Sequence, residues 1–286
     1  MTASAEARIG GATRLAGVIG WPVEHSLSPA IHNAAFADAG LDWAYVALPV
    51  PPGRVREAVV GLAALGFAGA NVTMPHKTEV ADLVDRRSED AELLRAVNTI
   101  RVAGDVVEGH NTDVGGFDRF LRRDAGFEPA GRSALVYGAG GAARACALAL
   151  ARAGIARLAV VVREPGRADG VRGVATSLGV PVEVLSPDGA AGRRFDLVVN
   201  ATPVGGPHEP EHRSIPELGS EVTVVDLRYD PPITPLQHHA REAGATTFGG
   251  VGLLVEQAAL SFELWTAAPA PLEVMSAAAL AALAER

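Results

Sequence analysis

Short apolar runs alternate with stretches of helical periodicity along most of the chain, which predicts strands separated by helices. In the first third, strands are expected at Leu15–Ile19, Trp43–Leu48 and Gly69–Thr73, with a hairpin formed by Thr99–Val102 and Val106–Gly109. The helices expected in the same region are Ser28–Ala39, Val55–Leu65, Pro75–Val84 and Ser88–Arg95. The first 110 residues therefore form one self-contained α/β unit.

A second α/β unit is expected after a linking helix at Phe117–Arg123. Helices at Gly170–Leu178 and Pro235–Ala243 and a loop at Pro203–Glu217 separate its apolar runs, so crossover connections and a parallel sheet are expected. Its expected strands are Ala134–Tyr137, Leu158–Val162, Val180–Val184, Asp196–Asn200, Val222–Asp226 and Thr246–Phe248. Two tail segments, Val251–Trp265 and Leu272–Glu285, are helical by pattern and belong to neither unit by pattern alone.

The stretch Ser133–Arg144 holds the strongest local motif, because three glycines separate an apolar run from an alanine-rich helix at Ala142–Ala153. With Ala143 in the last place, it matches the dinucleotide fingerprint G-x-G-x-x-G/A. Gly138 allows the tight turn and Gly140 lets the backbone approach a pyrophosphate, which the free N–H groups at the helix start would hold. The alternative is an ordinary βα turn, and the strand-turn-helix context favours nucleotide binding.

Composition narrows the class of protein. The chain has 286 residues, 48% of them hydrophobic and 20% charged, which is typical of a globular protein with two domains. A formal net charge of −8 argues against a nucleic-acid partner but leaves room for a small anionic substrate. Cys146 is the only cysteine, so a reducing compartment is expected. We see no signal peptide in Met1–Arg14 and no apolar run of membrane-spanning length, so a cytoplasmic protein is expected.

Polar clusters fall where expected loops meet strand ends, the usual place for ligands in α/β sheets. Ser26 and Ser28 stand just before a helix and suit a carboxylate; alternatively, Ser28 only caps that helix. Asn71–Lys77, Asn98-Thr99 and Asn111–Asp113 each have an ordinary interpretation when taken alone: a surface lysine, an unremarkable asparagine and a helix cap. His25 and His32 have no metal-ligand set nearby, so no metal site is expected.

Taken together, eight such motifs closely resemble shikimate dehydrogenase, in that family's order and from Leu15 to the C-terminus. The motifs are Gly20–Asn33, Asn71–Lys77, Ala96–Thr99, Gly109–Asp113, Gly138–Ala143, Asn200–Gly205, Asp226–Pro231 and Gly250–Gln257.

The resemblance implies a two-domain α/β fold. An N-terminal substrate domain, 1–113, would be completed by the C-terminal helices of 249–286, and a Rossmann-type doubly wound parallel sheet, 114–248, would bind NADP. It also implies the reversible NADPH-dependent reduction of 3-dehydroshikimate to shikimate in aromatic amino acid biosynthesis. We expect a monomer or homodimer that binds a small-molecule substrate and neither nucleic acid nor a membrane.

The resemblance also assigns roles by motif. Lys77 and Asp113 would be the catalytic pair, and Ser26 and Ser28 would hold the substrate carboxylate. The residues that would bind the ring hydroxyls or line the site are Asn71, Thr73, Asn98, Tyr229 and Gln257. The residues that would bind NADP are Gly138, Ala139, Gly140, Gly141, Ala142, Arg163, Arg167, Thr202 and Gly250.

Few positions depart from the family pattern. Leu253 replaces a common methionine and Ala267 a usual glycine, and neither bears on function. The basic turn, often Asn-Arg-Thr, is here Val162-Arg163-Glu164, and Glu164 would disfavour a 2′-phosphate if it pointed inward. The alternatives are a quinate or quinate/shikimate dehydrogenase that prefers NAD, a catalytically silent relative that binds shikimate or NADP, and a folate-linked dehydrogenase of similar architecture. The paired serines favour shikimate over the first and the last of these.

Overall fold

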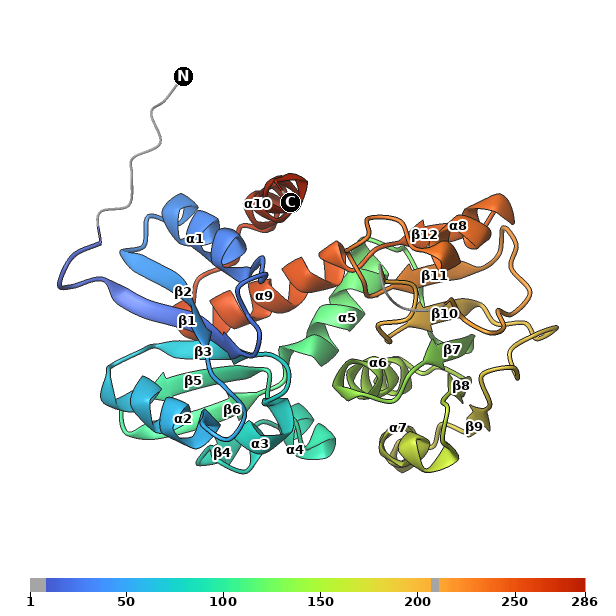
Figure 1. The fold of residues 1–286 in the computed structure, drawn as a ribbon, viewed down its shortest axis with the longest axis horizontal. Coiled ribbons are helices and arrows are strands. Elements are labelled where there is room, and N and C mark those ends of the chain that lie inside the picture. Colours follow the sequence, from blue (N-terminus) through green and yellow to red (C-terminus); the bar gives the residue numbers. More distant parts are fainter. Residues whose placement is uncertain (1–8, 207–210, 286) are drawn as a thin grey trace, which may run out of the picture. The chain divides into compact units, whose positions relative to one another are not determined.

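The computed structural model describes residues 9–206 and 211–285, and the chain divides into two compact units (Figure 1). Unit 1 comprises Met1–Thr112 and Gln257–Arg286, and unit 2 comprises Asp113–Glu256. The expected division was 1–113 with 249–286 against 114–248, so the two differ mainly in where the second boundary falls. Both units are α/β, as the alternating pattern predicted.

Unit 1 contains a six-stranded sheet of order β2-β1-β3-β5-β6-β4. Strand β1 pairs in parallel with β2 and β3, whereas β5 pairs antiparallel with both β3 and β6. The predicted hairpin is therefore confirmed, and it places Thr99 directly opposite Asn71 on the neighbouring strand. The bounds are β1 Arg14–Gly20, β2 Trp43–Pro49, β3 Gly69–Val72, β4 Arg86–Arg87, β5 Thr99–Ala103 and β6 Val106–His110.

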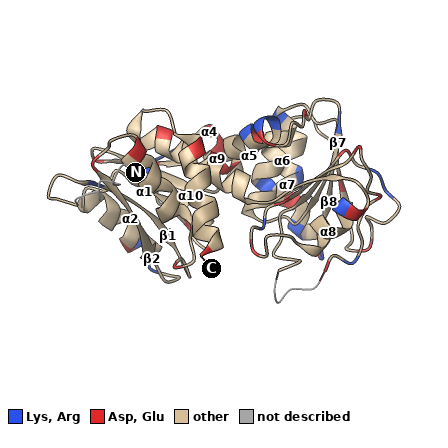
Figure 2. Cartoon of the chain, turned by 90° about the horizontal axis from the view of Figure 1, so that it is seen from above, with Lys and Arg blue, Asp and Glu red and all other residues tan. Residues whose placement is uncertain are grey.

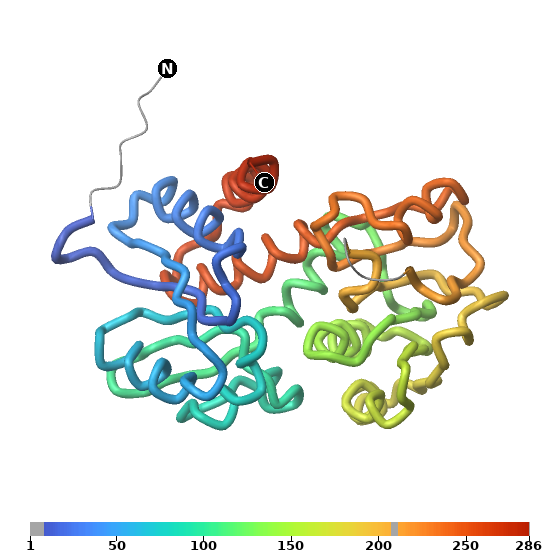
Figure 3. Tube along the Cα trace, in the orientation of Figure 1, coloured from blue at the N-terminus to red at the C-terminus, as the bar shows by residue number. Residues whose placement is uncertain are grey.

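Helices cover this sheet because their apolar positions recur at helical spacing. The C-terminal helix α10 returns to the start of the chain and packs against α1, as the red and blue ends of the trace in Figure 3 show. One apolar core lies between the sheet and α2, with Ile19, Val59 and Ile100 in it. The bounds are α1 Ser28–Asp38, α2 Val55–Ala64, α3 Lys77–Ala81, α4 Glu89–Leu94 and α10 Leu272–Ala284.

Two local predictions in unit 1 were wrong. Ser28 is not the N-cap of α1: Leu27 occupies that position without a side-chain cap, and the Ser26 hydroxyl instead accepts a hydrogen bond from the Ser28 N–H at 3.2 Å. Helix α3 is also shorter than the expected Pro75–Val84, because its first hydrogen bonds form only after the turn closed by His76 N–H on the Thr73 carbonyl.

Unit 2 contains a second six-stranded sheet, of order β12-β11-β10-β7-β8-β9, in which every pair is parallel. Numbered from β7 as the first strand, this is the order 3-2-1-4-5-6 of the doubly wound dinucleotide-binding fold. The predicted fold class is thus confirmed. The bounds are β7 Ser133–Tyr137, β8 Arg157–Val161, β9 Val182–Leu185, β10 Leu197–Asn200, β11 Thr223–Asp226 and β12 Thr246–Phe248.

The helices of unit 2 follow the pattern of the sequence, with one extension. Helix α5 begins at Thr112 and not at Phe117, since Val114, Phe117 and Phe120 are all buried and packing outweighs the weak propensity of the glycines at 115 and 116. Thr234 caps α8 with a capping box. The bounds are α5 Thr112–Arg123, α6 Gly141–Arg152, η1 Pro165–Ala168, α7 Asp169–Ser177 and α8 Pro235–Glu242. Helix α9, Val251–Thr266, begins in unit 2, and its residues from Gln257 onward belong to unit 1.

Two surface properties bear on the class of protein. Among the described residues, no helix combines the length and the apolar character needed to span a bilayer. Lys, Arg, Asp and Glu are interspersed over the helices and loops (Figure 2), and several arginines are paired, as Arg122 is with Asp118 and Arg172 with Asp169. The exclusion of nucleic acid stays a prediction.

Candidate active site

The side chain of Asn71, at the end of β3, is the centre of a buried hydrogen-bond network in unit 1. Its Oδ1 accepts from the Tyr45 hydroxyl at 2.7 Å, and its Nδ2 donates to Thr99 Oγ1 at 3.0 Å and to Ser261 Oγ at 2.9 Å. The strand register explains the Thr99 contact, because cross-strand partners project to the same face of a sheet. The network holds Asn71 in one orientation.

Asn98 extends this network toward α5. Its Nδ2 donates to Thr112 Oγ1 at 3.0 Å, and its Oδ1 accepts from the Thr112 N–H at 2.7 Å. The preceding residue, Val97, donates its N–H to the Lys77 carbonyl at 2.8 Å, so the backbone at the start of α3 is fixed to the same segment. The segment of Asn98 therefore anchors the backbone of Lys77 on one side and of Thr112, the residue before Asp113, on the other.

Ser28 is linked to the network through Tyr45. Burial raises the pKa of the Tyr45 phenol well above its usual value, and a hydrogen bond with the Ser28 side chain opposes that rise only in part. Ser28 is buried and Ser26 half-buried, in the turn that opens α1. Two hydroxyls at the open end of a helix can both donate to one carboxylate.

An aromatic cluster around His32 of α1 adjoins this network at Tyr45. The His32 ring stacks on Tyr45 with centroids 4.4 Å apart and lies 5.3 Å from the Trp265 ring. Burial lowers the pKa of His32 to about 3, which the neighbouring Asn71 side chain opposes in part, so the ring is neutral near pH 7. Its two buried nitrogens have no hydrogen-bond partner among the described residues, and its role here is packing.

In unit 2 the glycine turn after β7 has two different environments. Gly138 has φ of +102°, and a Cβ there would lie 2.8 Å from Thr202 Cγ2 and 3.0 Å from the Ala201 carbonyl, so only glycine fits. At Gly140 and Gly141 a Cβ would meet no atom within 4 Å. The turn thus packs tightly on the loop after β10 and leaves open space beside the N-terminus of α6, which suits a pyrophosphate.

The basic turn after β8 exposes Arg163 and Arg167. Glu164 lies 3.8 Å from the Arg167 guanidinium, with both side chains largely exposed. Its carboxylate is thus within ion-pair distance of a neighbouring arginine of the same turn, and a role of Arg163 at a 2′-phosphate stays a prediction.

Buried hydrogen bonds of Asn200 and Asp226 hold the loops that follow β10 and β11. Asn200 donates to Asp226 at 3.0 Å and accepts from the Thr202 N–H at 3.1 Å, while Asp226 also accepts from Thr234 Oγ1 at 2.7 Å. Burial raises the pKa of Asp226, and these hydrogen bonds oppose that rise. Thr202 and the loop that leads to Tyr229 are thereby held at the carboxyl ends of adjacent strands.

Gly250, just before α9, packs on the same loop. Its N–H donates to the Arg228 carbonyl at 2.9 Å, and a Cβ at this position would lie 2.1 Å from the Leu227 carbonyl oxygen. Glycine is therefore required for the close approach of two backbones, one of which continues into Tyr229.

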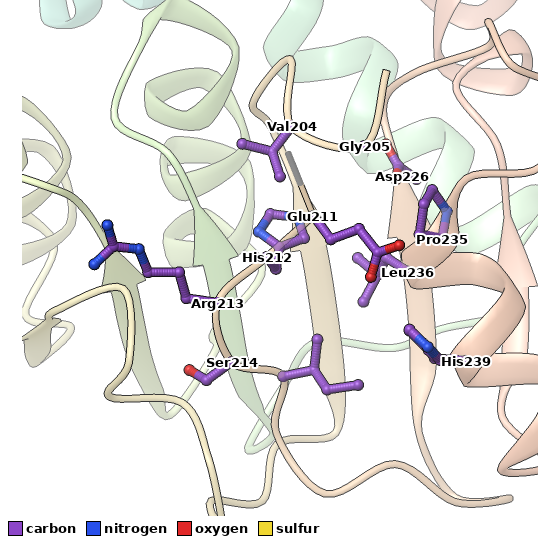
Figure 4. A pocket seen from close by; sticks show the side chains of 11 residues that line it. Val204, Gly205, Glu211, His212, Arg213, Ser214, Asp226, Pro235, Leu236 and His239 are labelled. Atoms are coloured by element: carbon purple, nitrogen blue, oxygen red, sulfur yellow. The ribbon is translucent and has the colours of Figure 1, made fainter. Parts of the chain in front are cut away.

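A pocket of about 160 Å³ lies elsewhere in unit 2, between the loop after β10 and α8 (Figure 4). His212 packs against Tyr137 beside it, with ring centroids 4.0 Å apart, and burial lowers the pKa of His212 to about 4. None of the residues predicted for substrate or cofactor lines this pocket, so it is not part of the candidate active site.

The structure thus brings Ser28, Asn71 and Asn98 together in one unit and arranges the predicted NADP residues of unit 2 around one sheet edge. Lys77, Thr73 and Gln257 are half-buried in unit 1, and Asp113 and Tyr229 are half-buried in unit 2. Sequence reasoning missed Tyr45 and Ser261, whose contacts join distant segments, and it named Thr99 without giving it a role. Within the described residues, no group of three or more His, Cys, Asp or Glu side chains could hold a metal ion.

The doubly wound sheet, its glycine turn and a separate unit with a buried polar network define a two-domain α/β protein of the nucleotide-dependent dehydrogenase class. Comparison with known proteins narrows this class. Residues 18–100 match the model of the shikimate dehydrogenase substrate binding domain, and residues 250–280 match the shikimate 5'-dehydrogenase C-terminal domain.

Individual relatives agree over nearly the full length. Shikimate dehydrogenase (NADP(+)) of Methanopyrus kandleri is 46% identical over 94% of this chain and 95% of its own. A solved shikimate dehydrogenase in complex with NADP+ is 36% identical, with a TM-score of 0.87 over 96% of this chain and 97% of its own. The Thermus thermophilus enzyme, solved with NADP(H) and shikimate, is 34% identical, with a TM-score of 0.83 over 94% and 100% of the two chains. The chain belongs to the shikimate dehydrogenase family.

Proposed function

We propose that this protein catalyses the reversible NADPH-dependent reduction of 3-dehydroshikimate to shikimate. The observation that carries the proposal is the buried network of unit 1, in which Thr99 joins Asn71 to Asn98. A small polyhydroxy acid needs several oriented hydrogen bonds and an anion clamp in one place. The names and bound ligands of the relatives, shikimate and NADP, support the same assignment.

Lys77 is the proposed proton donor and acceptor at the C3 oxygen of the substrate. When bound, NADPH supplies the hydride that converts the C3 ketone to an alcohol. The Lys77 ammonium stabilises the negative charge that develops on that oxygen and then protonates it, and in the reverse direction the neutral amine accepts the hydroxyl proton. Asp113 is proposed to orient the Lys77 amine, and the protonation of the two side chains is proposed to be coupled.

The composition of the chain supports this role. Lys77 is the only lysine, and all the other residues counted as Lys or Arg are arginines. Arginine serves as a surface cation as well as lysine does, but its guanidinium does not lose a proton in proteins. Lysine thus stands only where the proposed chemistry requires a cation that can transfer a proton.

The remaining residues hold the two ligands in this proposal. Ser26 and Ser28 bind the carboxylate, and Asn71, Thr73, Asn98, Tyr229 and Gln257 bind ring hydroxyls or line the site. NADP lies on the backbone of residues 138–142, with Thr202 and Gly250 beside it and Arg163 and Arg167 at the 2′-phosphate. The protein is proposed to act in the cytoplasm as a monomer or homodimer, with small molecules as its ligands.

Initial rates of the purified protein test this function directly. Shikimate and quinate are each assayed with NADP and with NAD, following reduced cofactor by absorbance. We expect kcat/KM to be highest for shikimate with NADP. A preference for quinate or for NAD would assign the chain to the quinate-oxidising relatives, and ligand binding without turnover would make it a non-catalytic one.

A further inference from the structure

Ser261 of α9 occupies the point where four elements of unit 1 meet, and its side chain is fully buried. Its hydroxyl lies 2.9 Å from Asn71 Nδ2 of β3, 2.9 Å from Thr99 Oγ1 of β5 and 3.3 Å from Thr112 Oγ1. It also donates to the carbonyl of Gln257, one helical turn earlier, at 3.1 Å. One hydroxyl therefore connects two strands with the turn of α9 that carries Gln257.

The contact with Asn71 controls the orientation of that amide. The backbone carbonyl of Asn98, 3.4 Å from Asn71 Nδ2, can only accept a hydrogen bond, so the amide nitrogen must face this side of the network. Ser261 provides an acceptor for the same nitrogen at a shorter distance. Without it, a buried amide proton loses a partner, and Asn71 can rotate away from the single orientation in which Tyr45 also donates to it.

We propose that Ser261 is a positioning residue of the substrate site. It does not touch the substrate: it holds Asn71, together with their shared partner Thr99, so that Asn71 keeps the orientation that binds the substrate, and it fixes the turn of α9 at Gln257. This inference rests on the proposed function, because Asn71 and Gln257 are taken there as substrate-binding residues. It predicts that loss of one buried hydroxyl weakens the recognition of shikimate without affecting the nicotinamide cofactor.

The test is the steady-state kinetics of Ser261→Ala with shikimate and NADP. The KM for shikimate should rise about 5- to 100-fold, the range expected when a buried donor is left unpaired, while the KM for NADP changes less than about twofold. The loss in kcat should be smaller than the rise in KM. Ser261→Thr keeps the hydroxyl and should restore the KM to within about threefold of the original protein.

Thr266 provides a matched control on the same helix. Its hydroxyl donates to the Phe262 carbonyl at 2.8 Å, four residues earlier, just as Ser261 donates to Gln257, but it lies outside the network. Thr266→Ala should therefore leave the KM for shikimate unchanged. If Ser261→Ala unfolds at the assay temperature, Ser261→Cys, which has a similar volume and only a weak donor, is assayed with the same expectation.

A double-mutant cycle separates positioning from a general structural role. If Ser261 acts through Asn71, the effects of Ser261→Ala and Asn71→Ala on the KM for shikimate are clearly less than additive. Additive effects, an unchanged KM for shikimate in Ser261→Ala, or equal changes for both ligands would overturn the inference. A parent protein that does not oxidise shikimate would instead overturn the proposed function, and the two failures are therefore distinguishable.

Discussion

In unit 1 predicted substrate residues such as Asn71 and Asn98 are held by side-chain hydrogen bonds in a buried network, whereas in unit 2 two glycines of the predicted NADP turn, Gly140 and Gly141, stand beside open space at the N-terminus of α6. Both the oxygen and the nitrogen of the Asn71 side chain are hydrogen-bonded. At Gly140 and Gly141, by contrast, a Cβ would have no protein atom within 4 Å. A substrate with hydroxyls at several positions requires directed side chains, and a pyrophosphate requires only N–H groups and room. Unit 1 is thus suited to bind its ligand through side chains, and unit 2 is suited to bind its ligand through backbone N–H groups.

The largest effect is expected at Lys77, which is proposed to transfer a proton and not to bind substrate or cofactor. Lys77→Met should lower kcat about 10²- to 10⁴-fold with a much smaller change in substrate affinity, since it removes the proton-transfer group and keeps most of the stem. Lys77→Arg keeps the positive charge but cannot give up a proton, so it should be nearly as slow. The measurement is single-turnover and steady-state kinetics with shikimate and NADP.

Asp113→Asn should also lower kcat, and combined with Lys77→Met it should be less than additive because the pair acts as a unit. A Lys77→Met protein with near-normal kcat and only a raised KM would make Lys77 a binding residue. A Lys77→Arg protein with near-normal kcat would reduce the role of Lys77 to its charge.

The next effect tests the one side chain on which cofactor selectivity is proposed to depend. Arg163→Ala should raise the KM for NADP about 10- to 100-fold and leave that for NAD little changed, because a charge-assisted contact to the 2′-phosphate is lost. Arg172, which is paired with Asp169 at 2.8 Å, supplies an exposed arginine of the neighbouring helix as the control. An equal loss with both cofactors would contradict the assignment.

The glycine turn offers a sharper test of the open-space argument. Gly140→Ala should fold with an unchanged Tm, because its Cβ meets no protein atom and its φ of −72° suits alanine, yet it should weaken NADP binding about 10-fold or more by filling the space. Gly138→Ala should lower the Tm as well, since its Cβ would clash with Thr202 at a positive φ. If Gly140→Ala bound NADP normally, the pyrophosphate would lie elsewhere.

A further expected effect concerns the stability of unit 1 and not its activity. The pKa of His32 is about 3 in the folded state against an ordinary 6.5, so the unfolded chain binds the extra proton between these values and stability falls as the pH falls. Between pH 7 and pH 5 this amounts to about 2 kcal/mol. In urea unfolding, His32→Phe, which preserves an aromatic ring against Tyr45, should lose that part of the pH dependence.

An equal pH dependence in His32→Phe and in the original protein would show that His32 is accessible to protons in the folded state.

Most elements of the fold could be predicted because the spacing of apolar residues and the positions of turn residues indicated the same helices and strands. The longer strands of both sheets and helix α8, predicted at Pro235–Ala243 and found at Pro235–Glu242, are confirmed. The errors fall where tertiary contacts outweigh local preference. Helix α5 begins at Thr112, which is anchored on Asn98, despite two glycines in its first turns, and the two-residue strand β4 has no apolar signal at all.

The same limit applies to the site. Motifs identified Asn71 and Asn98, whose roles stay predictions, but no local pattern pointed to Tyr45 or Ser261. Ser261 lies 190 residues from Asn71 in sequence, and only the folded chain brings its hydroxyl to the Asn71 amide of β3. The single lysine was a signal in the composition that sequence reasoning could have used.

Calorimetric titration of shikimate into the cofactor-free protein tests most directly whether unit 1 holds a prebuilt substrate site. The network predicts measurable binding without NADP, weakened about 2- to 100-fold in Ser26→Ala and in Ser28→Ala, where a hydrogen bond to the carboxylate is lost. Binding that requires NADP, or an affinity for shikimate unchanged in both serine variants, would contradict it.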